Sequence, residues 1–316
     1  MSNAPTVSVV IPCHDAAGTL ALQLAALSRQ DAAPDFEIVV VDNRSRDGLA
    51  AVVQRWAAEL PRLRLVSAPR LPGAAYARNV GIGASTGERL LFCDADDVVA
   101  RDWVREGAAV LEQVAVVNGD DVTLPFAAFT CLDSVWDGHL DRRPRGELER
   151  ISEPVPYPIL LGGNFASRRE TLLSVGGFDA AMIDANEDND LAVRLQRSGA
   201  LIHRSHAMLI AQRSRAGAKA SFRRAFRAGR GHVALAATHD LRRDSPSLSR
   251  GTWRLDPLRA SGAAAKMATR PRDQRDWPAV ATRLGAGLGL WLGEVDRWRG
   301  RSQEPAIGAG IEEGQT

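Results

Sequence analysis

The sequence predicts an α/β protein whose mostly parallel, Rossmann-like sheet is flanked by helices. Two observations lead to this fold: short apolar runs recur through the first 120 residues, and a helix-compatible stretch separates each run from the next. Uninterrupted apolar runs are typical of strands buried on both faces, as in parallel sheets. Parallel neighbours also need a crossover connection, which is usually a helix. The repeated order of strand, helix and strand therefore favours a doubly wound domain.

Four strands and three helices are expected in this first part of the chain. The strands are expected at 7–11, 36–41, 63–66 and 89–93, and the helices at 20–30, 49–59 and 74–84. Open α/β sheets bind their ligands beyond the carboxyl ends of the strands. Pro12, Asp42 and Asp94 each follow a predicted strand directly. We therefore expect a nucleotide site at this edge of the sheet.

The pattern weakens after residue 121. Several prolines break the regularity between 122 and 160, where loops and short elements are expected. Further along we expect a helix from Arg168, a helix near Glu187, short strands near Leu201 and at 208–211, and a basic helix at 218–237. Residues 240–278 are rich in Arg, Pro and Ser and are expected to be loop-like, and the tail beyond Gln303 to be disordered.

Cysteine usage and the terminal sequence indicate a compartment. Cys13, Cys93 and Cys131 lie far apart in sequence and form neither a disulfide framework nor a thiolate metal site, which favours reducing conditions. The first ten residues show no signal-peptide pattern, and no apolar run approaches the roughly 20 residues that span a bilayer. We therefore expect a cytoplasmic location.

The charge is unevenly distributed. Residues 1–200 carry 28 acidic and 19 basic side chains, whereas residues 201–316 carry 10 acidic and 21 basic ones. The acidic part could hold a cation, and the basic part could meet phosphates or an anionic membrane surface. A drift in composition without function is the alternative.

The strongest chemical signal is the run Asp94-Ala95-Asp96-Asp97, which directly follows a predicted apolar strand. Carboxylates two residues apart at a strand exit can converge on one point. Oxygen-only ligands suit a hard cation such as Mg²⁺ or Mn²⁺, which also takes phosphate oxygens. A solvated acidic turn is the alternative, but the position after a strand favours the metal.

A second acidic run, Glu187-Asp188-Asn189-Asp190, opens a predicted helix. Two interpretations stand side by side. Acidic residues in a first helical turn stabilise the helix through its dipole. Alternatively, Asp188 is a general base that accepts the proton of a hydroxyl, and the same dipole keeps it ionised. The residues 42–48 are open in the same way: Asp42 or Asn43 could bind a base or ribose, or the run could be a capped turn.

Other enzyme signatures are missing from the sequence. The glycines at 81–87 follow a predicted helix and precede a strand, whereas a dinucleotide-binding loop requires the opposite order. The sequence also contains no Walker lysine motif, no GxSxG elbow and no HExxH motif.

Taken together, these runs resemble the family-2 glycosyltransferases of the GT-A fold, from Thr6 to Ser214. The matching segments are VSVVIPCHDAAGTL, VVVDNRSRDG, GAAYARNVGIGASTGERLLFCDADD, GGNFASRRETL, VGGFD and EDNDLAVRLQRSG. The resemblance implies an inverting enzyme that uses Mn²⁺ or Mg²⁺ and moves a sugar from a nucleoside-diphosphate sugar to an acceptor hydroxyl. It also implies a catalytic domain at 1–214, with a nucleotide-sugar half to about 120 and an acceptor half from 121. Beyond the match, the sequence predicts a helical extension at 215–302 and a disordered tail at 303–316.

The resemblance assigns roles to individual residues. It places the donor among Pro12, Asp15, Asp42, Asn43, Arg78, Asn79 and Asp94. It gives the metal to Asp94 and Asp96, and the sugar or acceptor pocket to Gly163 and Asn164. Asp188 matches the catalytic base, with Glu187 beside it.

Some positions depart from the family pattern. Asn43 stands where a carboxylate often reads a uracil imide, so the base of the donor stays open. Ala211 stands where many relatives carry a histidine, which leaves a third protein ligand for the metal open as well. An inactive nucleotide-sugar-binding or scaffold protein is the alternative to the enzyme. A nucleotidyltransferase would need a Gly-rich basic loop after the first strand, and this chain has none there.

The C-terminal region allows two interpretations. From Arg213 to Arg243 there are nine Lys/Arg side chains and one acidic residue. The helix expected there could pack on the catalytic domain with a solvated basic face. Alternatively, it makes a peripheral membrane contact at the inner face, with the apolar run at 284–291 and Trp298 as a second segment. Nucleic acid is not expected as a partner, because no reading motif accompanies the charge.

Overall fold

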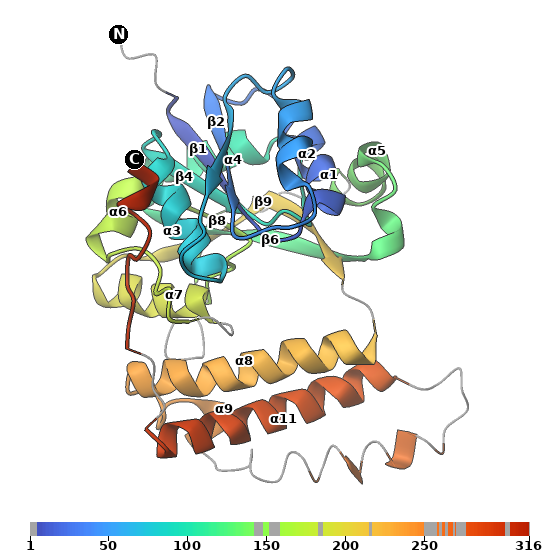
Figure 1. Ribbon diagram of the computed structural model, residues 1–316, viewed down its shortest axis with the longest axis vertical. Helices are drawn as coiled ribbons and strands as arrows, with labels where there is room; N and C mark the ends of the chain where they lie inside the picture. The colour runs from blue at the N-terminus through green and yellow to red at the C-terminus, as the bar shows by residue number, and fades with distance from the viewer. Residues whose placement is uncertain are drawn as a thin grey trace.

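The computed structural model describes residues 5–141, 148–151, 159–182, 186–214, 217–249, 258, 261–262, 265–267, 269, 276–300 and 304–315. Its centre is a nine-stranded sheet with the order β3-β2-β1-β4-β8-β6-β9-β5, and β7 pairs with β9 (Figure 1). The strands are β1 (Val7–Cys13), β2 (Phe36–Asp42), β3 (Leu63–Ser67), β4 (Arg89–Cys93), β5 (Val98–Val99), β6 (Val116–Pro125), β7 (Leu148–Arg150), β8 (Asn164–Arg168) and β9 (Ile202–Ser214).

Helices cover both faces of this sheet, and two long helices lie beyond it (Figure 1). The helices are α1 (Ala17–Ser28), α2 (Leu49–Trp56), α3 (Ala74–Ala84), α4 (Trp103–Gln113), α5 (Leu132–Val135), α6 (Arg169–Ser174), α7 (Glu187–Arg197), α8 (Ala218–Thr238), α9 (Pro246–Ser249) and α11 (Trp277–Trp298). Among the described helices, none combines the length and the apolar character that a bilayer crossing requires. The predicted α/β fold class is confirmed.

The first half of the sheet matches the sequence prediction. Strands β1 to β4 form a parallel set in which Val9 of β1 pairs with Ile38 of β2 on one side and Leu91 of β4 on the other. Successive strand residues face opposite sides of a sheet. Val9 accordingly packs in the apolar cluster that holds α1 and α4, and Val10 in the cluster that holds α3 and α7. Both faces of β1, β2 and β4 are buried, which explains their uninterrupted apolar runs, whereas β3 at the edge of the sheet is largely exposed.

The second half of the sheet differs from the prediction. Strand β8 runs antiparallel to both β4 and β6, and β6 then runs parallel to β9. The two short strands expected near Leu201 and at 208–211 are one strand, β9, with a pairing irregularity opposite Asn118 and Asp120 of β6. Between the two expected strands, His203 and Arg204 are half-buried and Ser205 is buried, and all three pair with the short strand β7.

The tail that was expected to be disordered is packed on the sheet domain over residues 304–315, and that prediction is wrong there. Ile307 forms a β-bridge with Asp179, the Ala306 amide donates to Asp179 Oδ1 at 2.7 Å, and Asn79 Nδ2 donates to the Ala309 carbonyl at 3.0 Å. The tail is poor in large apolar residues, so its sequence resembles a disordered segment. Its contacts are instead made by backbone groups, by the close approach of Gly310 to α3, and by Glu313, which accepts from the Tyr76 hydroxyl and pairs with Arg70.

Gly83→Ala should loosen this tail. A β-carbon at Gly83, in α3, would lie 1.9 Å from the Ile311 carbonyl oxygen, so the tail backbone would have to move. We expect a loss of about 1–3 kcal/mol in the free energy of unfolding, the usual cost of overpacking. Urea denaturation measures it.

The matched control is Gly18→Ala in α1, where a β-carbon would meet nothing within 4 Å. Alanine is a better helix former than glycine, so this variant should be neutral or slightly more stable. Equal stability of the two variants would show that the tail does not pack on α3 in solution.

Helices α8 and α11 form a parallel pair that is pressed together along a line of glycines. β-carbons at Gly285 and Gly289 of α11 would lie 2.4 and 2.2 Å from the carbonyl oxygens of Phe222 and Phe226 of α8. The basic helix expected at 218–237 is therefore confirmed. The prediction of a loop at 240–278 is wrong at α9 and at the start of α11, which are helical. Most of the other residues in that range lie outside the described ones.

Candidate functional site

A cleft of about 1030 Å³ opens at the carboxyl edge of β1, β2 and β4. It lies where the sequence predicts a nucleotide site. It is lined by Pro12, Cys13, His14, Asp15, Ala16, Thr19, Asn43, Arg44, Ser45, Arg46, Pro72, Gly73, Ala74, Ala77, Arg78, Asp94, Ala95, Asp96 and Glu187.

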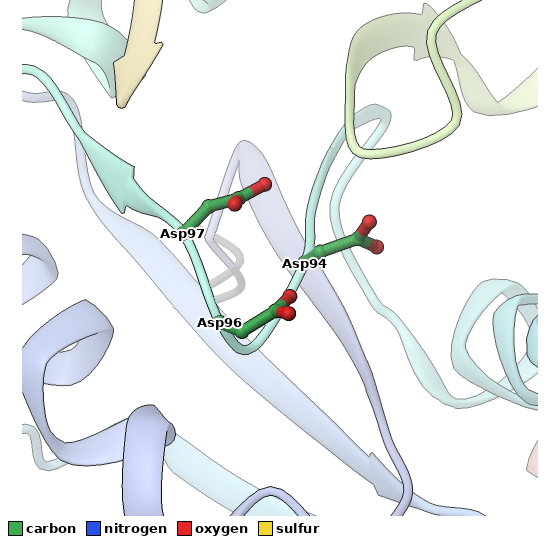
Figure 2. A group of neighbouring side chains, drawn as sticks. All are labelled: Asp94, Asp96 and Asp97. Carbon is green, nitrogen blue, oxygen red and sulfur yellow. The ribbon is translucent and has the colours of Figure 1, made fainter. Parts of the chain in front are cut away.

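Three carboxylates follow β4 in one tight turn, the acidic turn Asp94, Asp96 and Asp97 (Figure 2). One ligand oxygen from each lies within 4.8 Å of the others. The strand holds Asp94 in place, because β4 lies between β1 and β8 and is buried from Leu90 to Cys93. Asp97 is itself buried, and the sequence prediction did not assign it to the metal.

Burial and mutual repulsion disfavour the charged forms of the carboxyls in the acidic turn. Burial raises the pKa of Asp94, with Asp96 adding to the effect and Arg78 opposing it. Burial, together with Asp94 and Asp96, raises the pKa of Asp97 to about 8. A cation bound among these oxygens would stabilise the charged forms. The oxygen-only donor set fits Mg²⁺ or Mn²⁺.

Arg78 of α3 connects the acidic turn to α7. Its Nη2 donates to Asp94 Oδ1 at 3.0 Å, and its Nη1 donates to Glu187 Oε1 at 2.9 Å. The side chain is buried, with the whole residue 3% exposed. Burial alone would lower the pKa of Arg78, but the carboxylates of Asp94 and Glu187 outweigh it and raise the pKa. One guanidinium thus holds together carboxylates that are far apart in the sequence.

Asp188 lies next to this bridge in the first turn of α7. Its Oδ2 accepts from the Gly162 amide at 3.1 Å, and its Oδ1 accepts from the Asn189 amide at 2.8 Å. Burial and the neighbouring Glu187 raise its pKa to about 6, against the opposing effect of Arg78 and these amides. A carboxyl with this pKa is mostly ionised at neutral pH and can still take up a proton.

Two glycines before β8 make room for the carboxylates. A β-carbon at Gly162 would lie 3.2 Å from Asp188 Oδ2, and one at Gly163 would lie 2.6 Å from Asp94 Oδ2. Gly163 therefore contacts the acidic turn, and it is not among the residues that line the cleft. Any side chain here would push on the acidic turn or on Asp188.

Asn79 and Asn164 are buried and do not line the cleft, and their predicted contacts with donor and sugar stay predictions. Asn79 donates to the Phe178 carbonyl at 2.9 Å and accepts from the Phe178 amide at 2.8 Å, in addition to its bond with the tail. Asn164 accepts from Trp103 Nε1 at 2.8 Å, and its amide nitrogen donates to two backbone carbonyls. Both amides fasten secondary-structure elements together.

The first two strand-end loops are interlocked at the cleft. Asn43 Nδ2 donates to the carbonyls of Ala68 and Leu71, at 2.6 and 2.8 Å, so both of its amide hydrogens are already used. Asp42 Oδ1 accepts from the Ser45 amide at 2.9 Å, and Asp42 is not among the lining residues. Asp15 does line the cleft and accepts from the Arg46 amide at 2.7 Å.

Two basic side chains near the cleft, Arg46 and Arg213, were missed by the sequence prediction. Arg44 and Arg46 line its rim. Arg213 of β9 reaches the acidic turn, where its Nε donates to the Asp96 carbonyl at 2.9 Å and its amide to Asp97 Oδ1 at 3.1 Å. Ala211 is buried opposite Val98 of β5. Of the residues that the sequence prediction missed, only Asp97 could have been found from the sequence, because it directly follows Asp96. The arginines are identified by their place in the fold.

Comparison with known proteins agrees with this geometry. The chain is 28% identical over 200 residues to the amylovoran biosynthesis glycosyltransferase AmsB of Erwinia amylovora, which covers 61% of this chain and 64% of that protein. It is 33% identical over 242 residues to the uncharacterized glycosyltransferase YfnE of Bacillus subtilis, covering 61% of this chain and 60% of that protein. The matched parts are thus less than two thirds of these relatives.

Two solved structures share the fold. The mannosyltransferase PcManGT of Pyrobaculum calidifontis, in complex with GDP-Man and Mn²⁺, superposes with a TM-score of 0.61 at 23% identity, over 94% of this chain and 88% of that one. S. aureus TarS 1-349 in complex with UDP gives a TM-score of 0.55 at 17% identity, over 93% of this chain and 92% of that one. The family model for glycosyl transferase family 2 matches residues 8–175, more than half of the sequence, and the chain belongs to this family.

Proposed function

We propose that this chain is an inverting, metal-dependent glycosyltransferase that moves a sugar from a nucleoside-diphosphate sugar to an acceptor hydroxyl. The observation that carries the proposal is the Arg78 bridge, which holds Asp94 of the acidic turn and Glu187, the neighbour of Asp188, at one cleft. A displacement needs a site for the leaving group and a base for the nucleophile. Arg78 brings both kinds of group together.

The residues divide the chemistry between them. Asp94, Asp96 and Asp97 would hold Mn²⁺ or Mg²⁺, which neutralises the charge that grows on the departing diphosphate. Asp188 accepts the proton of the acceptor hydroxyl while the oxygen of that hydroxyl forms a bond to the anomeric carbon of the sugar. The bond from that carbon to the phosphate oxygen breaks in the same step, so the configuration inverts.

The donor occupies the cleft between the interlocked loops and α3. Of the residues predicted to bind it, Pro12, Asp15, Asn43, Arg78 and Asp94 line the cleft. The solved relatives are in complex with GDP-Man in one case and UDP in another. We therefore propose a purine or pyrimidine nucleoside diphosphate as the carrier. The cytoplasmic location and the peripheral membrane contact predicted from the sequence belong to this proposal.

A donor panel tests the proposal. Purified protein is incubated with Mn²⁺, each of several GDP- and UDP-sugars, and simple alcohols or saccharides as acceptors. Release of nucleoside diphosphate that depends on Mn²⁺ supports it. Binding without turnover would instead favour the inactive scaffold, and pyrophosphate-dependent exchange would favour a nucleotidyltransferase.

Asp96→Asn should weaken the dependence on metal. It removes one charged ligand from the acidic turn, and even the loss of a ligand's outer partner costs about 10–100-fold in metal affinity. We expect the Mn²⁺ concentration for half-maximal turnover to rise by at least about tenfold. Glu59→Gln, an exposed acidic residue outside the cleft, is the control and should leave it unchanged. An unchanged Mn²⁺ dependence in Asp96→Asn would remove Asp96 from the metal site.

A further inference from the structure

We propose that the α8–α11 helix pair docks this chain on an anionic lipid bilayer and that the acceptor is a lipid-linked alcohol. The docking surface itself does not depend on the proposed function; the choice of acceptor rests on it. The surface consists of the outer face of α11 and the basic face of α8.

The outer face of α11 carries large apolar side chains where a helix of a globular protein usually has polar ones. Its members are spaced three, four or seven residues apart and therefore lie on one side of the helix: the exposed Trp277, Trp291 and Trp298, and the half-buried Leu284, Leu288 and Val295. Trp298 is 81% exposed, Trp291 47% and Trp277 39%. The side that packs on α8 is instead built from Gly285, Gly289 and Gly293. Glycines buried and tryptophans exposed indicate an apolar partner outside α11.

The neighbouring helix supplies positive charge. Helix α8 contains five Lys/Arg side chains and no acidic one. Lys219, Arg223, Arg224 and Arg227 are exposed. Helices that lie in a membrane interface combine a basic polar face with Trp and Leu on the apolar face, and tryptophan prefers the headgroup level. The composition of the pair matches that of an interfacial helix.

An anionic bilayer fits this surface better than a second copy of the chain does. A symmetric dimer would bring the same patch of each copy together. The basic faces of two α8 helices would then lie near each other and repel. Anionic headgroups satisfy the same charges, and each Lys/Arg near such a surface favours binding.

The helix pair is fastened to the helix that carries Asp188. His239, which follows α8, places Nε2 2.7 Å from Asp190 Oδ1 of α7, and its carbonyl accepts from Arg197 Nη2 at 2.7 Å. The Asn186 amide nitrogen, just before α7, donates to the Ala228 carbonyl of α8 at 3.2 Å. Figure 1 shows the pair at one end of the molecule, with α8 between α7 and α11. The helix pair, and with it a bilayer docked on its outer face, would therefore be held in a fixed position relative to α7 and Asp188.

Vesicle co-sedimentation of the full chain tests the docking. Vesicles of phosphatidylglycerol and phosphatidylcholine are compared with vesicles of phosphatidylcholine alone, at low and high salt. We expect binding to the anionic vesicles that weakens with salt. The double variant Arg223→Glu/Arg227→Glu should lower this partitioning by at least about 30-fold, since two basic contacts are lost. Trp291→Ser/Trp298→Ser should lower it as well.

Matched controls make the same changes elsewhere on the surface. Arg29→Glu/Arg55→Glu reverses two charges near α1 and α2, and Leu173→Ser removes an exposed apolar side chain from α6. Both should bind vesicles as the wild type does. No binding of the wild type to anionic vesicles at low salt would overturn the docking. The docking would also be overturned if analytical ultracentrifugation showed that the wild type is a dimer and that Trp291→Ser/Trp298→Ser is a monomer, while vesicle binding stayed unchanged.

Turnover separates this inference from the proposed function. The surface variants leave the cleft intact, so their release of nucleoside diphosphate with a soluble acceptor should equal that of the wild type. With an acceptor alcohol carried in anionic vesicles, their kcat/KM should fall in step with vesicle binding. Vesicle binding without any turnover would support the docking and contradict the enzyme. Equal kcat/KM for vesicle-borne and soluble acceptors would contradict the lipid-linked acceptor.

Discussion

Asp188→Asn is expected to lower kcat by about 10²–10⁴-fold, the usual contribution of a positioned general base. Donor binding should be retained, because Asp188 is not among the residues that line the cleft. Asparagine keeps the shape of the side chain and can still accept from the Gly162 amide, so the turn before β8 should hold. Nucleoside diphosphate release measures kcat, and isothermal titration with the donor and Mn²⁺ measures binding.

The pH dependence follows from the same carboxyl. Since the pKa of Asp188 is raised to about 6, the base is lost to protonation as the pH falls below 6, and wild-type kcat should then fall about tenfold per pH unit. In Asp188→Asn this acid limb should be absent from the residual activity. An acid limb that survives the substitution would assign the base to another group.

The stability of Asp188→Asn should change in the opposite direction to its activity. A raised pKa in the folded state means that the protonated form is favoured by folding. The stability contributed by that proton is complete below the ordinary pKa of 3.8 and is lost as the pH rises through about 6. At pH 7.5 the variant, which carries no charge there, should therefore melt at a higher temperature than the wild type. The difference should shrink below pH 4, and an unchanged difference would exclude Asp188 as its cause.

Periodicity predicts strands well where both faces are buried. Strands β1, β2 and β4 are buried along most of their length and have few polar residues in their centres, so their position and their parallel order could be read from the sequence. Strand β8 is equally buried, but nothing in the residues at 164–168 shows that it runs antiparallel to β4. Strand direction is set by the path of the connections, which the local sequence does not carry.

The candidate site shows the same limit. The acidic turn and Asp188 were found because acidic residues next to a strand end or a helix start are visible in a short window. The bonds that Asn79 and Asn164 make to distant parts of the chain could not be predicted, because an amide looks alike in sequence whether it faces a ligand or a distant backbone. Their partners include Phe178 and Trp103, which lie 99 and 61 residues away. Arg78 was assigned to the donor, and its bridge between Asp94 and Glu187 follows only from the fold.

Arg78→Met is expected to cost about 3–5 kcal/mol of unfolding free energy, because it leaves carboxylates buried without their cation. Methionine fills a volume similar to that of arginine, so the loss of stability reflects the missing positive charge and not a cavity. The unfolding free energy of Arg78→Lys should lie between those of Arg78→Met and the wild type. One ammonium keeps the positive charge but cannot donate in two fixed directions as a guanidinium does. Turnover should fall in both, because Glu187 and Asp94 would no longer be held at one cleft.

Arg101→Met is the matched control, because Arg101 also donates to two carboxylates, Asp137 and Asp141, but at the surface. Exposed pairs of this kind contribute at most about 1 kcal/mol each. Urea unfolding with and without Mn²⁺ then gives a sharper test. If the acidic turn binds the cation, Mn²⁺ should restore more stability to Arg78→Met than to Arg101→Met, since it supplies positive charge to Asp94 in place of the arginine. Equal responses to Mn²⁺ would mean that Arg78 and the metal do not share a carboxylate, and the single cleft on which the proposed reaction depends would be lost.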